Sequence, residues 1–546
     1  MAIIHQKDKR SGITYVYESI SQWDKEKKQS RSKRRLIGRL DEQTGEVVPT
    51  DGRCRKRSPS YVPPEQHEEP DSTSAPAMAK RLFCGATYLL DQIGALTGVT
   101  EDLKACFPDT YRQILSIVYY LILEDHSPLF RFHRWERIHR HPYGEDITSQ
   151  RSSELFQSVT EEAKERFFRR QANRRVENEF WAYDTTSISS YSECLRQVRF
   201  GHNKDHDSLP QINLALLFGE QSGLPFYYRK IAGNIPDVKT IHEMIRELDV
   251  LDTGKVKLVM DRGFYSAANV NALYKAHLKF ILGTSSSLRY VRDFIQEIGS
   301  GKDAYDHYCE DYELFMFNKT IAWDYEQVRP YKGDVVRGER RMYLHLYYNP
   351  DQAAEDSKSL SKRIAALKRE LLEGKRVAAH QKDYDRFFVV KTTPVRGISV
   401  TVKQDAIDQA RERYGFFALI SNEVKDPLAA LQLYRTRDAV EKAFWDVKDR
   451  LNCKRTLVSS ETGLEGKLFV EFVALIYLSY IKKQMEANGL FRTYTLNGVL
   501  DELDAIECLI VPGKAPILGE VLKRQEQLYL DLGVKPLLAK QVCGGG

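Results

Sequence analysis

Two aspartates occupy positions from which they could bind a metal ion together. Asp184 lies inside the otherwise apolar and aromatic predicted strand 180–189. Asp261 directly follows the apolar run Leu258 to Met260. A carboxylate on a buried strand is costly unless it is paired or binds a metal ion. A single Asp at a strand end is more often a turn or capping residue. Two of them at the ends of neighbouring predicted strands make a shared metal site a stronger hypothesis.

A later segment, predicted to be one long helix starting near Asp426 and Pro427, adds a polar stripe. The residues of this stripe, at offsets of 0, 3, 7 and 14, are Tyr434, Arg437, Glu441 and Lys448. At about 100° per residue these side chains project within roughly 60° of one another. A neighbouring apolar stripe supplies the packing face. The polar stripe can also be a solvated face on which Arg437 and Glu441 form an ordinary ion pair.

Three carboxylates gathered from separate elements suit the in-line cleavage or transfer of a DNA phosphodiester. That chemistry calls for two divalent cations about 3.5–4 Å apart, one at the attacking oxygen and one at the leaving oxygen. Mg²⁺ prefers carboxylate oxygens and keeps positions open for water and phosphate. Tyr, Arg and Lys side chains beside the glutamate could hold the phosphates of the strand. Asp184, Asp261 and Glu441 are therefore the predicted catalytic and metal-binding residues.

The elements that must position these residues follow from the periodicity of the chain. Strands are predicted at 180–189, 213–220, 224–232, 255–261 and 279–284, with helices at 236–251 and 267–276. Three strands followed by an alternation of helix and strand predict an α/β fold with a mixed sheet. Residues 289–410 break this rhythm with aromatic β-like runs around an amphipathic helix, and a strand at 415–422 resumes it. We interpret 289–410 as an insertion.

The region before residue 179 divides into three predicted parts. Residues 1–60 combine short β-like runs, at 14–19 and 36–40, with dense positive charge, which indicates a basic β-ribbon. Residues 61–78 are rich in Pro, Ser and Glu and indicate a linker. Residues 79–178 have helical periodicity and two concentrations of arginine. Arginines on helices suit DNA contact, but surface arginines on a helical bundle are commoner, so both interpretations stay open.

Composition limits the class of protein. The 546 residues are 42% hydrophobic and 29% charged, which excludes global disorder and predicts several domains. A net charge of +6 does not by itself indicate a nucleic-acid partner. The eight cysteines form no Cys-x-x-Cys pair, which fits a cytoplasmic protein without a disulfide framework. The N-terminus lacks a secretory apolar region, and the apolar stretch 468–481 is too short for a membrane span.

The loop GHNKDHD, residues 201–207, contains two histidines and two aspartates. Its members are His202, Asp205, His206 and Asp207. Histidines in a loop rich in Gly and Asn are more often strand-capping or substrate-loop residues than zinc ligands, so no zinc site is predicted. Asp237, after Gly233 and Asn234, is predicted only to turn the chain into the next helix.

The motifs taken together resemble those of a known family. The spacing Tyr-x2-Arg-x3-Glu-x6-Lys is similar to the YREK signature of bacterial insertion-sequence DDE transposases of the IS-four superfamily. The stretches YDTTS, FGEQSGLPFYYRKIAGNIPDVKTI and MDRGFYS are similar as well, and so is the basic run that leads to IGRLDEQTGEVVP. The likeness covers residues from about 10 to 485. Four ordered motifs make a strong signal where any one would be weak.

The resemblance implies an RNase H-like core interrupted by a β-rich insertion domain, preceded by an N-terminal basic and helical DNA-binding region. The expected parts are the core at 179–288 and 411–488, the insertion domain at 289–410 and a C-terminal region at 489–546. The spacing agrees with this expectation, because 77 positions separate Asp184 from Asp261 while 180 separate Asp261 from Glu441.

The resemblance also implies an activity. Such an enzyme binds terminal inverted repeats in double-stranded DNA, cleaves at the transposon ends and transfers the 3′ ends into target DNA. The three acids would bind two Mg²⁺ or Mn²⁺ ions per site, and a homodimer would bring two ends together in the cytoplasm, on the nucleoid. The expected DNA-binding residues are Tyr434, Arg437, Lys448, Arg262 and Trp323. For Trp323 the implied role is stacking on a flipped base, although a place in an aromatic core explains it as well.

Two other functions would suit the same fold. One is a catalytically inactive DNA-binding regulator, against which the presence of all three acids and the full signature argues. The other is a structure-specific RNase H-like nuclease, which would cleave DNA without joining the cut ends to a target.

Overall fold

The computed structural model of the chain divides into two units, Met1–Pro76 and Ala77–Gly546, which we describe separately. The residues it describes are 2–8, 12–24, 29–41, 45–48, 79–175, 179–192, 195–205, 207–251, 256–328, 335–393, 397–451, 455–456, 458, 460–511 and 514–538. The predicted linker at 61–78, His206 and the end of the C-terminal region therefore lie outside the described residues.

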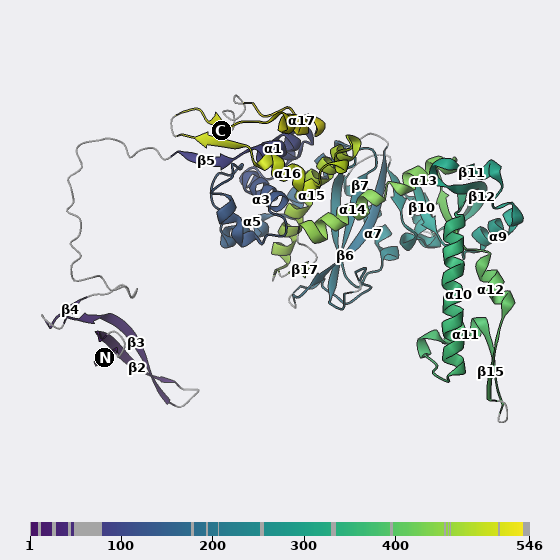
Figure 1. The fold of residues 1–546 in the computed structure, drawn as a ribbon, viewed down its shortest axis with the longest axis horizontal. Coiled ribbons are helices and arrows are strands. Elements are labelled where there is room, and N and C mark those ends of the chain that lie inside the picture. The colour runs from purple at the N-terminus through teal and green to yellow at the C-terminus, as the bar shows by residue number, and fades with distance from the viewer. Residues whose placement is uncertain are drawn as a thin grey trace. The chain divides into compact units, whose positions relative to one another are not determined.

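The first unit contains an antiparallel sheet in the order β1-β2-β3-β4 (Figure 1). Its strands are β1 (Ala2–Lys7), β2 (Thr14–Asp24), β3 (Gln29–Leu40) and β4 (Val47–Val48). The strands predicted at 14–19 and 36–40 are present and extend further along the chain.

A ten-stranded sheet, counted over the described residues, forms the centre of the second unit. Its strands beside the predicted site are β6 (Phe180–Ser190), β7 (Gln211–Gly219), β8 (Pro225–Ala232), β9 (Lys257–Met260), β10 (Lys279–Thr284) and β16 (Phe416–Ser421), with the short β17 (Arg455–Thr456) also paired to β6. Strands β6, β7 and β8 are antiparallel to one another, whereas β9 is parallel to β6 and β10 is parallel to β9. This order confirms the predicted RNase H-like mixed sheet.

Helices cover the sheet, and every residue of β6 is buried. Tyr183 of β6 donates a hydrogen bond to Thr240 of α7 (Asp237–Leu251), and α14 (Asp438–Trp445) contacts β6 and β7. The first half of β6 is apolar and aromatic, as a strand buried on both faces requires, whereas its second half buries Asp184 and several hydroxyl side chains. Helix α8 (Ala267–Lys275) connects β9 to β10.

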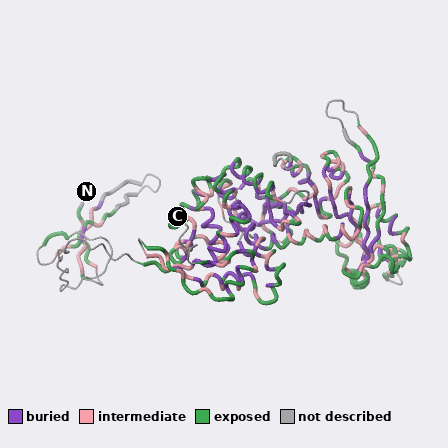
Figure 2. The backbone as a smooth tube through the Cα atoms, turned by 90° about the horizontal axis from the view of Figure 1, so that it is seen from above, coloured by how far each residue is buried: buried purple, intermediate pink, exposed green. Residues whose placement is uncertain are grey.

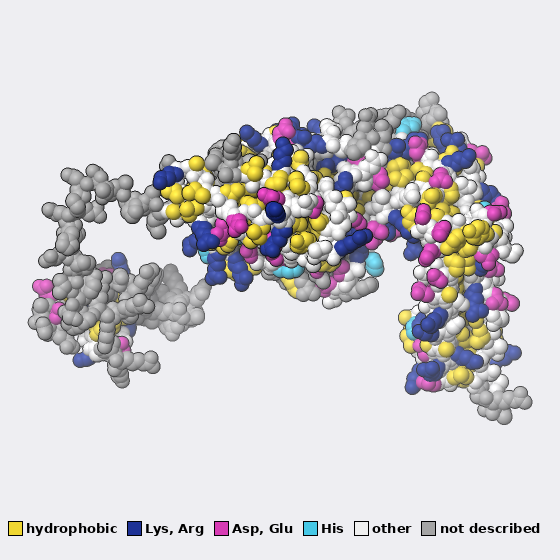
Figure 3. Space-filling model, turned by 45° about the horizontal axis from the view of Figure 1, so that its top comes forward, with side chains coloured by type: hydrophobic (Ala, Val, Ile, Leu, Met, Phe, Trp, Pro, Cys, Tyr) yellow, Lys and Arg dark blue, Asp and Glu magenta, His cyan; other side chains and the backbone are white. Residues whose placement is uncertain are grey.

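The predicted insertion has two parts. In the first, β12 (Leu314–Val328) and β13 (Val335–Tyr348) form a long hairpin that pairs with β16, so it extends the central sheet. It also includes α9 (Arg289–Ile298) and β11 (Tyr308–Cys309). The second part forms an elongated arm with a small apolar core of its own (Figure 1). Its elements are α10 (Pro350–Leu372), α11 (Gln381–Phe387), β14 (Phe388–Thr393), β15 (Gly397–Val402) and α12 (Gln404–Arg411). Figure 3 shows side chains of both charges along this arm, as on an ordinary solvated surface.

The C-terminal region packs with the helical region as one body, an arrangement for which the sequence offered no prediction. Strand β5 (Lys80–Phe83) pairs with β18 (Glu507–Ile510), and β18 pairs with β19 (Ile517–Leu518). The central helix α15 (Glu461–Ala487) contacts the helical region through ring pairs such as Phe107 with Phe469. In Figure 2 the buried segments run through the interior of this body.

The other helices of this body are α1 (Gly85–Leu96), α2 (Val99–Cys106), α3 (Tyr111–Leu123), α4 (Phe132–Trp135), α5 (Ser149–Ser158), α6 (Glu161–Asn173), α16 (Leu496–Asp504) and α17 (Lys523–Asp531). None of the helices within the described ranges is long and apolar enough to cross a membrane.

Two arginines of the helical region form ion pairs with a buried aspartate of the same region. Asp102 of α2, with a fully buried side chain, accepts hydrogen bonds from Arg170, Gln171 and Arg174 of α6 or its C-cap at 2.7–2.8 Å. Burial alone would raise the pKa of Asp102, but these hydrogen bonds outweigh it and lower the pKa. Arg170 and Arg174 therefore fasten α6 to α2, whatever other arginines of this region contact.

The start of α13 (Pro427–Arg435) agrees with the sequence. Asp426 accepts a hydrogen bond from the backbone N–H of Ala429 at 2.7 Å, and Pro427 occupies the first turn. We expect Asp426→Ala to lower the free energy of unfolding by about 1 kcal/mol, while Asp426→Asn changes it little because Asn is as good an N-cap. Urea denaturation of the two variants measures this, and an alanine variant as stable as the wild type would contradict it.

Candidate active site

The segment with the polar stripe is not the continuous helix that the sequence predicts. Helix α13 ends at Arg435, α14 begins at Asp438, and residues 446–450 form a π-helical turn. The hydroxyl of Thr436 donates to the carbonyl of Leu433 at 2.6 Å, a local bond that competes with helical geometry. The prediction of one helix with a single straight stripe was therefore wrong. Lys448 lies in the π turn, where the helical periodicity no longer holds.

The sheet sets the two aspartates side by side. The parallel register of β6 and β9 pairs Tyr183 with Met260, so the next residues, Asp184 and Asp261, lie on neighbouring strands at the same level. Asp184 is buried, whereas the side chain of Asp261 is 42% exposed. Register in a sheet buried on both faces is strongly specified, so the pairing of the two carboxylates is built into the core.

Arg437 links the acids from the two strands to Glu441 of α14. Its guanidinium pairs with Asp261 at 2.8 Å and with Glu441 at 3.0 Å, and its charge also acts on Asp184. Burial alone would lower the pKa of Arg437, but Tyr434 and the nearby carboxylates outweigh it and raise the pKa. The guanidinium therefore remains charged between Asp261 and Glu441.

Tyr434 is held against the same acids. Its hydroxyl donates to Asp261 at 2.8 Å, and the Arg437 guanidinium lies 5.1 Å from its ring centroid. Burial, and then the charge of Asp261, raise the pKa of Tyr434, so the phenol stays protonated and able to donate. Gly283 of β10 allows this approach, because a Cβ there would lie 2.9 Å from the Tyr434 hydroxyl and 2.8 Å from the backbone nitrogen of Arg262.

Two residues without a predicted catalytic role complete the group of charges. Lys204 has its Nζ 3.7 Å from Asp184 and 3.0 Å from Asp237, the first residue of α7. Burial raises the pKa of Asp184 to about 6, against the opposing effect of Lys204. Four carboxylates thus face two cationic side chains, Lys204 and Arg437, which leaves an excess of two negative charges.

Divalent cations fit this site in donor type and in charge, since Mg²⁺ prefers carboxylate oxygens. Arg437 lies between the carboxylates of Asp261 and Glu441 and pairs with both. Across the described residues, no three His, Cys, Asp or Glu side chains lie close enough together to hold one ion in this arrangement. Glu441, which pairs with Arg437, is 55% exposed.

The remaining predicted site residues have other surroundings. Arg262 is exposed at the turn that follows Asp261. Lys448 is only 9% exposed and its Nζ pairs with Asp205 at 2.6 Å. Trp323 of β12 is half-buried, and its indole N–H donates to Asn271 of α8 at 2.8 Å. Four of the eight predicted residues are joined by hydrogen bonds and ion pairs, namely Asp261, Arg437, Glu441 and Tyr434. Asp184 lies at the same level as Asp261 on the neighbouring strand, while Lys448 and Trp323 have other partners and Arg262 is exposed.

Sequence analysis predicted no role here for Lys204, Asp205 or Asp237. Lys204 and Asp205 belong to the loop GHNKDHD, whose two histidines and two aspartates had been considered only as a zinc site. The charged residues of this Gly- and Asn-containing loop could have indicated a functional role. Their partners lie on elements distant in the sequence, so the sequence does not show which residues they contact.

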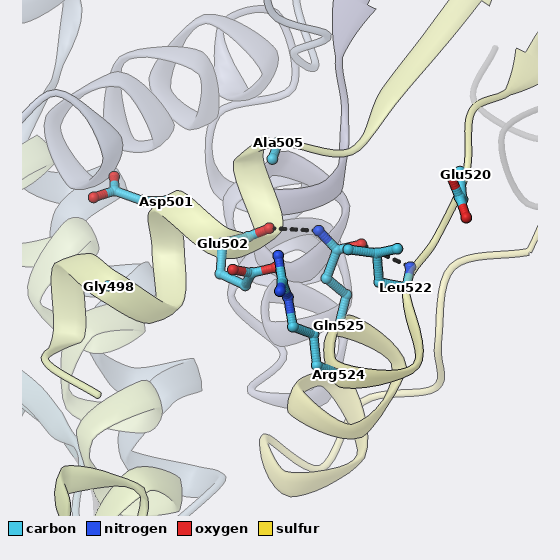
Figure 4. Close-up of a pocket in the computed structure, with 8 residues that line it drawn as sticks. All are labelled: Gly498, Asp501, Glu502, Ala505, Glu520, Leu522, Arg524 and Gln525. Atoms are coloured by element: carbon cyan, nitrogen blue, oxygen red, sulfur yellow. Dashed lines mark hydrogen bonds and ion pairs between the residues drawn. The ribbon is translucent and has the colours of Figure 1, made fainter. Parts of the chain in front are cut away.

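Two hollows of the described surface lie away from these residues. One, of about 410 Å³, is lined by α16 and the start of α17, where Arg524 pairs with Glu502 at 2.7 Å (Figure 4). Asp501, Glu502 and Glu520 outnumber its one arginine, so it would repel a DNA phosphate. Another, of about 470 Å³, lies between β8, α6 and α15 around Lys230 and Glu461. Neither contains a predicted site residue.

The mixed sheet thus holds Asp184 on β6 beside Asp261 at the end of β9, and Arg437 joins Asp261 to Glu441 of α14. The chain belongs to the Transposase DDE domain family, whose model matches residues 177–477, more than half of the chain. Membership makes it a DNA transposase. A search of curated proteins found no match.

A search of solved structures found, among others, the cryo-EM structure of the piggyBac transposase synaptic complex with hairpin DNA. The two chains are 11% identical, and the match covers 83% of this chain and 74% of the other. The TM-score is 0.33, too low a likeness to bear on fold or function.

Proposed function

We propose that this transposase binds the terminal inverted repeats of an insertion sequence, cleaves at its ends and transfers the 3′ ends into target DNA. We further propose that it is of the YREK type of the IS-four superfamily. The observation that supports this most is the position of Arg437, which pairs with Asp261 and Glu441 while Tyr434 hydrogen-bonds to Asp261. Tyr434 and Arg437 thus contact Asp261 directly, and Glu441 is linked to it through Arg437, which supports a shared role for these signature residues.

In this proposal Asp184, Asp261 and Glu441 hold two Mg²⁺ ions, for which Mn²⁺ can substitute. Bound there, the ions would activate the attacking oxygen and stabilise the leaving oxygen of the phosphodiester. Tyr434 orients Asp261 through its hydrogen bond. Arg437, once free of Glu441, offers a planar fork of N–H donors that matches a phosphate of the transposon end.

Other proposed DNA contacts surround this centre. Arg262 is exposed beside Asp261 and would contact the strand near the cut, and Lys448 would contact the transposon end. Trp323 keeps its proposed stacking role only if its half-buried ring can leave Asn271. The basic sheet of the first unit and the helical region would bind the repeats, and a homodimer, acting in the cytoplasm on the nucleoid, would pair two ends.

The test uses the full chain and a duplex with the inverted repeats that flank its coding region. We expect end cleavage, and joining of the 3′ ends to a target plasmid, in Mg²⁺ or Mn²⁺ and neither in EDTA. Cleavage without joining would instead identify a nuclease, and binding without cleavage a regulator. Light scattering of the complex with end DNA measures the dimer, and an active complex with one copy of the chain would contradict it.

A further inference from the structure

The loop between β6 and β7 folds back against β6, where side-chain and backbone hydrogen bonds hold it. The buried side chain of Asn203 donates to the hydroxyl of Ser189 at 3.2 Å and accepts from the backbone N–H of Asp205 at 2.8 Å. A Cβ on Gly201 would lie 1.9 Å from the carbonyl oxygen of Gly233, so only glycine fits at that approach. Residues 201–205, called here the positioning loop, therefore have one defined backbone path over the sheet.

Lys204 extends from this loop to the first aspartate of the site. Its ammonium donates to the carbonyl and the hydroxyl of Thr185, at 2.6 and 2.9 Å, and to Asp237 at 3.0 Å. The Thr185 hydroxyl in turn donates to Asp237. All three N–H groups of the ammonium are thereby used inside the protein. Since Asp184 precedes Thr185 and lies 3.7 Å from the same ammonium, Lys204 ties its strand to the start of α7.

Asp205, the next residue, extends to the opposite side of the site. Its carboxylate pairs at 2.6 Å with Lys448 in the π turn that follows α14. Lys448 is 9% exposed, and a buried charge that loses its partner is strongly destabilised. This pair leaves two N–H groups of the lysine for a further acceptor, such as a phosphate.

We propose that the positioning loop aligns the active site, Lys204 by placing Asp184 and Asp237, and Asp205 by placing Lys448. The inference rests on the proposed function, because it takes Asp184 and Lys448 as site residues. Backbone hydrogen bonds between β6, β7 and β9 already hold the sheet, so these ion pairs are not needed for its register. They join three elements that must stay aligned, and a displacement of about 1 Å at a reacting centre can cost on the order of 100-fold in rate.

The first test is a double-mutant cycle on Asp205 and Lys448, with end cleavage by the full chain as the reaction. Asp205→Asn should lower kcat by about 10- to 100-fold and change KM little. In the Lys448→Met background, Asp205→Asn should have no further effect, because Asp205 acts through that lysine. Asp205→Glu keeps the charge and should give an intermediate rate.

The control is Glu461→Gln, which removes one of the two carboxylate partners of a buried lysine, Lys230, while Glu465 remains at 2.8 Å. It should leave kcat at the wild-type value and lower Tm no more than Asp205→Asn does. An Asp205→Asn enzyme as fast as the wild type, or one whose effect simply adds to that of Lys448→Met, would overturn the inference. An inactive wild type would overturn the proposed function instead, so the two failures are distinguishable.

The second test addresses Lys204 and Asp237. Lys204→Met should lower kcat by about 10- to 100-fold, and Lys204→Arg should recover part of the rate because it restores the charge. Combining Lys204→Met with Asp237→Asn should lower kcat no further than the slower single variant. Full additivity, or an arginine variant no better than the methionine variant, would show that Lys204 does not act by holding this network.

Discussion

Asp184→Asn, Asp261→Asn and Glu441→Gln should each lower the rate of end cleavage by on the order of 10³-fold or more. Each substitution keeps the shape of the side chain and removes its negative charge. Metal-ion catalysis contributes several kcal/mol of transition-state stabilisation, and about 4 kcal/mol corresponds to that factor. Cleavage in Mg²⁺ and in Mn²⁺ measures the loss, and binding of the same duplex in EDTA should remain within a few-fold of the wild type.

The control for these acids is Glu423→Gln. Glu423 pairs with Lys279 at 2.8 Å where β10 begins, and Asp261 follows the end of the parallel strand β9, so this pair lies at the opposite end of the sheet. It should leave cleavage unchanged. Because burial raises the pKa of Asp184, its charge opposes folding, and Asp184→Asn should not lower Tm. Undiminished cleavage in any of the three acid variants would end its assignment to the site.

The strands of the core were predictable because their signal is local. The predicted strand at 180–189 is observed at Phe180–Ser190, and that at 224–232 is observed at Pro225–Ala232. Apolar runs bounded by turn residues define such strands without reference to the rest of the chain. The meeting of Asp184 with Asp261 also follows from this pattern, once β6 and β9 are parallel neighbours.

What escaped prediction depends on contacts between distant elements. The hairpin of β12 and β13 joins the sheet through β16, a pairing that no local pattern in 289–410 announces. The helix break near Thr436 follows from a side-chain bond to Leu433 that competes with the helix. The heptad-like spacing that placed Lys448 beside Glu441 assumed an unbroken helix, whereas the π turn directs Lys448 to Asp205.

The two basic residues of the predicted polar stripe, and Lys204 of the positioning loop, are already paired with acids in this structure. Arg437, Lys204 and Lys448 each have an acidic partner within 3.0 Å: Asp261, Asp237 and Asp205, respectively. A Lys or Arg in a sequence signature therefore predicts that a positive charge is present at the site. It does not predict that this charge is free to bind DNA. Any contact of Arg437 with phosphate must exchange one anionic partner for another, which a divalent cation at the carboxylates would favour electrostatically.

Asp102→Ala should have the largest effect on stability, lowering the free energy of unfolding by about 1–3 kcal/mol. The substitution removes the buried carboxylate that joins α6 to α2 and leaves the buried amide of Gln171 without this acceptor, while Arg170 and Arg174, 42% and 33% exposed, keep Glu101 as a partner. The matched control is Glu101→Ala. Glu101 contacts the same two arginines but is 70% exposed, so its loss should cost no more than about 1 kcal/mol.

The contribution of the Asp102 carboxylate to the free energy of unfolding should depend on pH. The folded-state pKa of Asp102 is lowered, so its stabilising effect is fully present above the ordinary aspartate pKa of about 3.9 and is lost as pH falls through the lower folded-state value. The stability difference between wild type and Asp102→Ala should therefore be constant from about pH 6 to 8 and shrink in acid. Urea denaturation across this range measures the difference, and native-state hydrogen exchange should show the loss in α2 and α6. A difference that grows in acid, or an alanine variant no weaker than Glu101→Ala, would mean that Asp102 does not fasten these helices as a charged group.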